Sequence, residues 1–299
     1  MSPTSLTRTR IAGAAPFGIA TAAFVLYLAT LCPTIYWKDS SEFVTVVHGL
    51  DVAHPAGSPT YSLLAKLFDL LPFADIATRV NLASAAAAAA AVGLLYALAL
   101  EFLSAVGVAP SRRGWIGVAA VGLFALSPAW WLLASTAEVY PLQNVFLIGV
   151  LGLLTRWWRT RGEGEGDLRL LAGAALLYGV SAGAHAAIAF FLPGIVLFGA
   201  VTLRSRMLRP RLMAALAAAF ALGLSVYLYL PVRSLAGDLA YDWGNPETPA
   251  RFLDHVLDRK DAALLTSVSA PKLPYQARLF AGFARDQITV VGAVLAVVG

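Results

Sequence analysis

Residues 80–105, VNLASAAAAAAAVGLLYALALEFLSA, carry one charged side chain, Glu101, in an otherwise apolar stretch. A helix of this length can cross the hydrocarbon core of a bilayer, which is about 30 Å thick. In lipid a segment must satisfy its backbone groups as a helix or within a closed barrel, and this stretch lacks the alternation of a barrel strand. It therefore predicts a transmembrane helix, in which the alanines at 85–91 allow close packing of neighbouring helices.

The same pattern recurs along the chain. Only 13% of the 299 residues are charged and 59% are hydrophobic, whereas about a quarter of the residues of an average soluble protein are charged. Further apolar stretches lie at about 12–31, 114–134, 139–158, 168–184, 186–203 and 212–230, and another begins near 287. We therefore predict an all-α polytopic membrane protein with about seven to eight transmembrane helices. Because 287–299 is too short to cross a bilayer, we expect the chain to be the N-terminal portion of a longer protein.

The arginines predict how these helices are oriented. If residues 1–11 are cytoplasmic, the segments on that side hold 12 of the 22 basic residues and only four of the 17 acidic residues. An excess of positive charge marks the cytoplasmic side of a membrane protein. We therefore expect two long outer segments, at 32–79 and 231–286. The first apolar stretch is expected to remain uncleaved, because no A-x-A cleavage site follows it.

Composition and motifs also exclude some partners. The isoelectric point is near 9.5, but the arginines form short clusters between the apolar stretches, so we do not expect nucleic acid as a partner. The sequence has neither a His-x-x-x-His pair nor two cysteines, and we predict no metal site. It has no phosphate-binding glycine motif either, so we predict no nucleotide cofactor.

Residues 37–59, WKDSSEFVTVVHGLDVAHPAGSP, gather acidic residues and histidines directly after the first apolar stretch. Asp39 and Glu42 have the spacing of a capping box, in which each would cap the start of the following helix. The alternative is a carboxylate that acts as a general base at the membrane surface. His54 is either a solvated loop histidine or a member of the same site.

Other polar residues stand near the outer ends of predicted helices. Glu138, in STAEVYPLQN, either marks a turn or is a functional carboxylate at membrane depth. His185, in GVSAGAHAAIAFFLPG, is either a buried, hydrogen-bonded histidine or a site residue. The helical spacing of apolar residues around Lys66 and Asp69 predicts a helix that lies along the membrane interface.

One arginine follows the predicted helix at 212–230. Arg233 could extend its side chain to the lipid headgroups, as long basic residues do at helix ends. Alternatively, Arg233 and Lys38 could hold the phosphate of an anionic lipid, since a guanidinium binds phosphate in a bidentate manner. The sequence alone leaves both readings open.

Four motifs make a resemblance recognisable from about residue 17 to the end of the chain: KDSSEFVTVVHGLDVAHPAGSPTYSLLAKLF, STAEVYPLQNVF, GAHAAIAFFLPG, and YLPVRS followed by YDWGNPETPARFLDHVLDRKD. In this order they resemble a family of bacterial and eukaryotic membrane proteins in the GT-C glycosyltransferase superfamily, whose animal member is a protein O-mannosyltransferase. The resemblance implies a seven-helix module within 12–286, with the first and fourth outer loops forming the site. The sequence has WKDSSE where relatives have glycines around the aspartate, and GSP where they prefer GYP, which leaves the choice of acceptor open.

The resemblance also implies roles for individual residues. It implies an acidic residue of the first outer loop in transfer, which here is Asp39 as general base with Glu42 and His54 in support. Arg233 and Lys38 are expected at the donor phosphate. The predicted catalytic residues are therefore Asp39 and Glu42, and the predicted substrate-binding residues are Lys38, His54, Glu138, Tyr140, His185, Arg233 and Trp243.

The function predicted on these grounds is an inverting glycosyltransferase of GT-C type in the cell (inner) membrane, with its active site on the outer, periplasmic face. It would move a sugar, with mannose expected, from a polyprenyl-phosphate donor to a hydroxyl of a protein, lipid or glycan acceptor. One alternative is a transporter or lipid-handling membrane protein. Transporters place their sites near the midplane and often contain repeats, whereas here the charges cluster at the outer ends of the helices. A second alternative is a binding fragment without activity.

Overall fold

The computed structural model describes residues 3–160, 168–204, 207, 209–259 and 270–298. Across these residues the chain is helical, and its one strand-like contact is an isolated bridge between Val52 and Asp242. The elements in chain order are α1 (Pro3–Ala29), α2 (Asp39–Gly49), α3 (Pro59–Asp69), α4 (Ile76–Ala105), α5 (Pro110–Ala125), α6 (Pro128–Ser135), α7 (Tyr140–Thr160), α8 (Leu168–Ala182), η1 (Ala186–Phe191), α9 (Leu192–Leu203), α10 (Pro210–Leu224), η3 (Ser225–Leu228), α11 (Tyr229–Ala236), α12 (Pro249–Val256), η4 (Ala270–Lys272) and α14 (Leu273–Val298).

The number of membrane-spanning helices differs from the prediction. Within the described residues, three helical segments are long and apolar enough to cross a membrane: Ile76–Ala105, Ala186–Leu203 and Pro210–Ala236. The pair α5 and α6, bent by 68°, adds a fourth if it forms one span. Shorter apolar helices cover Ala14–Ala29 and Leu168–Ala182. These findings support an all-α membrane protein, but they do not support seven to eight spans.

Local sequence explains the difference. The predicted helix at 114–134 is interrupted before Pro128, which lacks a backbone N–H and begins the separate helix α6. The predicted helix at 139–158 forms as α7, but Gln143 and Asn144 at one end and Arg156 at the other make it less apolar. The helix expected to begin near 287 starts earlier in the structure, at Leu273.

Close packing around α4 confirms the role predicted for its alanine run. Ala85, Ala88, Ala89 and Ala91 are buried in a cluster that includes Tyr27 of α1. A Cβ atom on Gly93 of the same helix would lie 2.8 Å from the backbone oxygen of Pro16. Small residues thus allow α1 and α4 to approach closely, as expected for helices in lipid.

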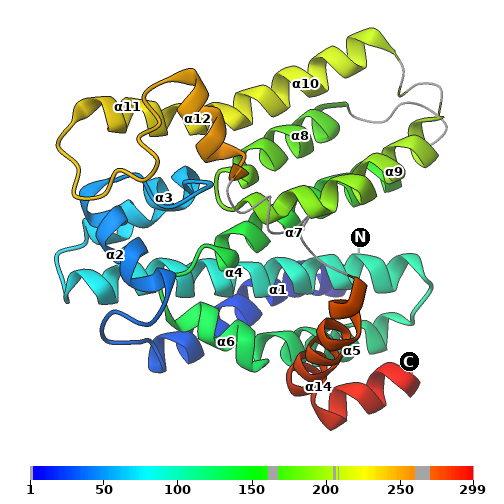
Figure 1. Cartoon of the computed structure of the whole chain (residues 1–299). Helices are drawn as coiled ribbons and strands as arrows, with labels where there is room; N and C mark the ends of the chain where they lie inside the picture. Colours follow the sequence, from blue (N-terminus) through cyan, green and yellow to red (C-terminus); the bar gives the residue numbers. More distant parts are fainter. Residues whose placement is uncertain (1–2, 161–167, 205–206, 208, 260–269, 299) are drawn as a thin grey trace.

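The helix bundle has two chemically different ends. Helices α2, α3, α11 and α12 lie together at one end, on the left in Figure 1. The second end is marked by a buried apolar cluster, which is formed by Trp157 of α7, Leu171 of α8 and Leu203 of α9 with the start of α10. The first end is built from the two segments predicted to be outer, and the second lies beside the arginine-containing connections.

The two predicted outer segments contact each other through their backbones. The Val52 N–H donates to the Tyr241 carbonyl at 3.0 Å, and the Tyr241 N–H donates to the Asp51 carboxylate at 3.1 Å. The Tyr229 hydroxyl donates to the Asp51 carbonyl at 3.0 Å. These bonds hold the loop after α2 against the first residue of α11 and against the chain that follows α11. The second predicted segment, 231–286, includes residues 260–269, which lie outside the described residues.

Candidate functional site

The start of α2 is the first part of the site. Asp39 is the first residue of the helix and is exposed, while Lys38 is the N-cap, with φ of 62° and no side-chain capping bond. The capping box predicted for Asp39 and Glu42 is therefore wrong, because Asp39 lies inside the helix and not before it. Its carboxylate stands at the positive end of the helix dipole.

Glu42 binds His54 and does not reach back to the helix start. The Glu42 carboxylate accepts the backbone N–H of His54 at 2.7 Å and the ring Nδ1 of His54 at 3.1 Å. The hydrogen bond to Glu42 raises the pKa of His54 above its ordinary value, although burial acts in the opposite direction. Burial alone would raise the pKa of Glu42, but the bonds from His54 lower it below its ordinary value. Both shifts favour the charged forms of the two side chains, as an ion pair between them requires.

Glu138 lies in the short connection between α6 and α7, and its backbone is fixed by α4. Its N–H donates to the Ser84 hydroxyl at 2.9 Å, and that hydroxyl donates back to the Glu138 carbonyl at 3.0 Å. The Tyr61 hydroxyl of α3 lies 3.1 Å from the same Ser84 oxygen. Among the described residues, the Glu138 Oε2 atom is one of the buried oxygens without a hydrogen-bond partner. The protein thus holds this carboxyl group rigidly but leaves one of its oxygens unsatisfied.

The charges around Glu138 bring the first and second motifs into one site. Burial raises the pKa of Glu138 to about 7, and the negative charge of Asp39 adds to this effect. Lys38 and His54 act in the opposite direction. Groups from the start of α2, from the loop at His54 and from the α6–α7 connection are therefore close enough to influence one another's protonation.

His185 and Tyr140 complete the polar cluster. The His185 ring packs against the Tyr140 ring, with the ring centroids 4.7 Å apart. His185 Nδ1 accepts the Ala187 N–H at 3.0 Å, which leaves the proton of a neutral imidazole on Nε2. Burial lowers the pKa of His185, and the charge of His54 lowers it further. The ring is therefore a neutral donor through Nε2, which agrees with the reading of His185 as a hydrogen-bonded histidine, while its role in a site stays a prediction.

Arg233 and Trp243 contact the C-terminal end of α2 and the loop that follows it. The Arg233 guanidinium donates to the carbonyl oxygens of Leu50 at 2.8 Å and Gly49 at 3.3 Å, and it lies 3.4 Å from the Asp238 carboxylate. These carbonyls are at the C-terminal end of α2, about 15 Å from Asp39 at 1.5 Å per residue. The Trp243 side chain is 46% exposed, and the Trp243 N–H donates to Val52 at 3.4 Å. Among the described residues, neither Arg233 nor Trp243 forms a hydrogen bond or ion pair with Asp39, Glu42 or Glu138.

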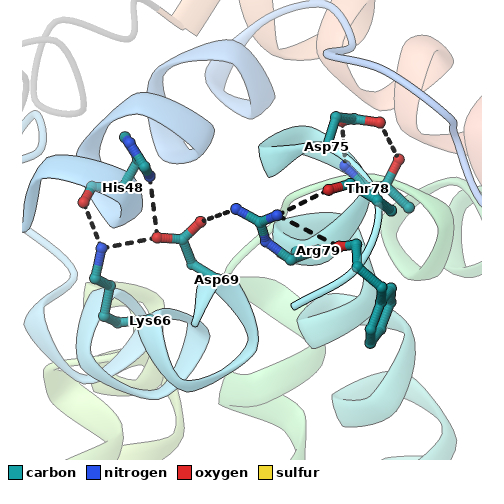
Figure 2. A network of polar contacts seen from close by, with 8 residues as sticks. His48, Lys66, Asp69, Asp75, Thr78 and Arg79 are labelled. Atoms are coloured by element: carbon teal, nitrogen blue, oxygen red, sulfur yellow. Dashed lines mark hydrogen bonds and ion pairs between the residues drawn. The ribbon is translucent and has the colours of Figure 1, made fainter. Parts of the chain in front are cut away.

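The sequence reading missed a buried carboxylate network beside the site, which Figure 2 shows from close by. Asp69, whose side chain is 2% exposed, accepts from Lys66 Nζ at 2.7 Å, His48 Nδ1 at 3.1 Å and Arg79 Nη2 at 3.1 Å. Burial alone would raise the pKa of Asp69, but the three donors lower it below its ordinary value. The spacing of Lys66 and Asp69 on one helix was a readable signal, whereas nothing in the sequence indicated His48 or Arg79.

His255 was also missed. This residue of α12 is 3% exposed and lies between two glycines: a Cβ on Gly57 would be 3.1 Å from Nε2, and one on Gly244 would be 2.7 Å from Nδ1. The ring therefore occupies space that only glycines leave free, and it locks the loop after His54 to the second outer segment. Across the part of the chain that the structure describes, no group of three His, Cys, Asp or Glu side chains could hold a metal ion.

Fold and site together define an all-α membrane protein with a cluster of carboxylates and histidines where its helices end. The chain belongs to the family of the protein O-mannosyl-transferase TMEM260 N-terminal domain, whose profile matches residues 39–209. This confirms the resemblance seen in the motifs.

Two curated relatives are similar to this chain. Protein O-mannosyl-transferase TMEM260 of Mus musculus is 33% identical over 243 residues, covering 81% of this chain and 33% of the relative. Protein O-mannosyl-transferase tmem260 of Dictyostelium discoideum is 22% identical over 247 residues, covering 78% of this chain and 29% of the relative. The chain thus spans about a third of the length of the curated relatives it matches. No solved structure matches it.

Proposed function

We propose that this chain forms the catalytic part of a membrane glycosyltransferase that moves mannose from a polyprenyl-phosphate donor to a hydroxyl of a protein acceptor. The observation that carries the proposal is the cluster in which Asp39, Glu138 and His54 share one site. Both curated relatives are named as protein O-mannosyl-transferases. The proposal extends that activity to this chain.

Asp39 is the general base of the proposed reaction. The acceptor oxygen bonds to the anomeric carbon of mannose while the bond from that carbon to the phosphate oxygen breaks. Asp39 takes the proton of the acceptor hydroxyl, and the phosphate leaves with the bonding electrons. A single displacement of this kind inverts the configuration at the anomeric carbon. An exposed carboxylate at the start of a helix is accessible to an acceptor.

The neighbouring residues bind the donor in this proposal. Lys38 offers a cation beside the acids for the departing phosphate, and the Glu42–His54 ion pair fixes the loop that faces it. The unsatisfied oxygen of Glu138 and the neutral His185 ring can hydrogen-bond sugar hydroxyls. Because Nε and Nη2 of Arg233 donate to carbonyl oxygens of α2, the proposal places the phosphate beside Lys38 and assigns no ligand to Arg233 or Trp243.

We further propose that the site opens on the outer, periplasmic face of the inner membrane, with residues 1–11 in the cytoplasm. The arginine distribution supports this orientation. A lipid-linked donor presents its phosphate and sugar at the membrane surface, where the ends of α2 and α7 and the start of η1 bring the cluster together.

Transfer from polyprenyl-phosphate mannose to serine- and threonine-containing peptides tests the proposal, with the full-length protein in lipid nanodiscs. Asp39→Asn keeps the size of the side chain and removes the base, so we expect transfer to fall by about 10²–10⁴-fold. Asp75→Asn is the matched control. Asp75 caps α4 by accepting from Thr78 at 2.9 Å, and asparagine caps equally well. Near-normal transfer by a folded Asp39→Asn protein contradicts the role of Asp39, and absence of transfer by the wild type contradicts the function.

A further inference from the structure

The C-terminal end of α2 has an unusual backbone. Helices commonly end with a glycine in the left-handed conformation, but here Leu50 takes that position, with φ of 54° and ψ of 44°. The N–H groups of Leu50 and Asp51 both donate to the Val46 carbonyl. A leucine in this conformation is strained, and the carbonyls of His48, Gly49 and Leu50 have no partner within the helix.

Cationic side chains from other elements bind all three of these carbonyls. Arg233 of α11 donates to Leu50 through Nε at 2.8 Å and to Gly49 through Nη2 at 3.3 Å. Lys66 of α3 donates to the His48 carbonyl at 2.5 Å. Positive charge at a helix C-terminus is favourable because it opposes the helix dipole. The ends of two other helices thus hold the last turn of α2.

The cation from α3 is itself fixed. Figure 2 shows Lys66 bound to Asp69, which also accepts from the His48 ring and from Arg79 at the start of α4. Arg79 in turn donates to the Ala74 carbonyl at 2.8 Å. His48 is therefore held through both its ring and its carbonyl. Arg233 is the side chain of the second outer segment that binds the last carbonyls of α2, and Tyr241 of the same segment bonds the following residues, Asp51 and Val52.

We propose that Arg233 is a positioning residue that fixes α2 from its C-terminal end, so that Asp39 and Glu42 keep their places in the cluster at the other end. A helix of this length behaves as a short rod, and an anchor at one end sets the position of the other. The catalytic consequence rests on the proposed function, whereas the anchoring of α2 does not. This role differs from binding of the donor phosphate. A phosphate-binding guanidinium would direct its N–H groups to the ligand, whereas Arg233 directs Nε and Nη2 to carbonyls of α2.

Hydrogen exchange of the α2 amides in the full-length protein in nanodiscs measures the anchoring directly. Arg233→Gln removes charge-assisted bonds to two carbonyls, so we expect exchange over residues 46–52 to be faster on the order of tenfold. Arg233→Lys, which can still bind one carbonyl, is expected to restore part of the protection. Arg251→Gln, on the exposed face of α12, is the matched control and should exchange as the wild type does. Unchanged exchange in Arg233→Gln overturns the proposal.

Kinetics of mannose transfer separate positioning from phosphate binding. For a positioning residue, Arg233→Gln lowers kcat while the KM for the polyprenyl-phosphate donor stays within about twofold. A large rise in the donor KM together with unchanged exchange would assign Arg233 to the phosphate and overturn the proposal. If the wild type transfers no sugar, the proposed function fails, and the exchange experiment still decides whether Arg233 anchors α2.

Discussion

Burial and the neighbouring charge of Asp39 both raise the pKa of the Glu138 carboxyl group, and they outweigh the opposite effects of Lys38 and His54. Burial and the charge of Asp39 raise its pKa to about 7 in the folded protein, compared with an ordinary value of 4.5. Between these values the folded protein binds more protons than the unfolded chain, so stability falls as the pH rises from about 4.5 to about 7. At 1.36 kcal/mol per pKa unit, this shift corresponds to an upper limit of roughly 3–4 kcal/mol for the single group.

Glu138→Gln should therefore remove part of the pH dependence of stability. Glutamine keeps the shape of the side chain and cannot ionise, so we expect the variant to be more stable than the wild type at pH 8 and similar at pH 5. Thermal unfolding in detergent at both pH values measures the difference. Glu247→Gln, in an exposed position, controls for the loss of a surface charge. Parallel pH profiles for the wild type and Glu138→Gln would show that Glu138 does not titrate in this range.

At the same scale, the sequence could identify which residues meet but not how each is used. Ionisable residues at the predicted outer ends of apolar stretches are expected near the same membrane surface, which is why Asp39, His54, Glu138 and His185 could be grouped in advance. The Glu42–His54 pair and the neutral tautomer of His185 depend on loop geometry that no periodicity records. Arg233 was predicted at the donor phosphate from the resemblance. Its distance from Asp39 depends on the direction of α2, which the sequence does not reveal.

At the scale of elements, the Asp69 network joins α2, α3 and α4 through one buried carboxylate. Removing one partner of a buried ion pair leaves the others uncompensated and typically costs about 3–5 kcal/mol. Lys66 and Arg79 are 20% and 15% exposed, so water offsets part of this cost. The folded-state pKa of Asp69 is lowered, so its stabilisation is complete above the ordinary aspartate pKa and is lost only as the pH falls through the lowered value.

Asp69→Ala should therefore lower the free energy of unfolding at pH 7 by about 3 kcal/mol. Asp69→Asn should cost less, since its amide oxygen still accepts a hydrogen bond. Unfolding in detergent followed by circular dichroism gives both values. Asp254→Ala is the control, because Asp254 forms an exposed pair with Arg259, and such pairs contribute about 0–1 kcal/mol. Equal losses for Asp69→Ala and Asp254→Ala would show that the buried network adds no stability.

Helix positions were easier to predict than helix ends. The long apolar stretches at α1, α4, α8 and α10 lie where the hydrophobic pattern placed them, and the helix around Lys66 and Asp69 is α3. The break between α5 and α6 was missed, because the sequence on both sides of Pro128 is equally apolar. Of the two readings left open for the Asp-x-x-Glu pattern at Asp39, the capping box is wrong, whereas Asp75, in an Asp-x-x-Thr sequence, does cap α4.

At the scale of the whole molecule, the polar site and the arginine-rich connections lie in different parts of the bundle. α2, α3, α11 and α12 gather at one end (Figure 1). Arg112 and Arg113 lie in the first turn of α5, and Arg159 near the end of α7 pairs with Glu101 near the end of α4. The sequence could predict this separation from its charges alone, because spans that alternate in direction place successive connections on alternate sides. It overestimated the number of spans, since apolar stretches also form bent and short helices.

The separation of charge leads to a test of orientation. If the arginine-rich side is cytoplasmic, a cysteine at Asp254 of α12 should react with a membrane-impermeant maleimide on intact cells, and a cysteine at Ser111 of α5 should not. Both positions are exposed, and Cys32→Ser provides a background without the native thiol. Permeabilising the membrane should make Ser111→Cys reactive without changing Asp254→Cys, which controls for local accessibility. The opposite pattern would place Asp39 and Glu138 in the cytoplasm and rule out a donor that presents its sugar on the outer face.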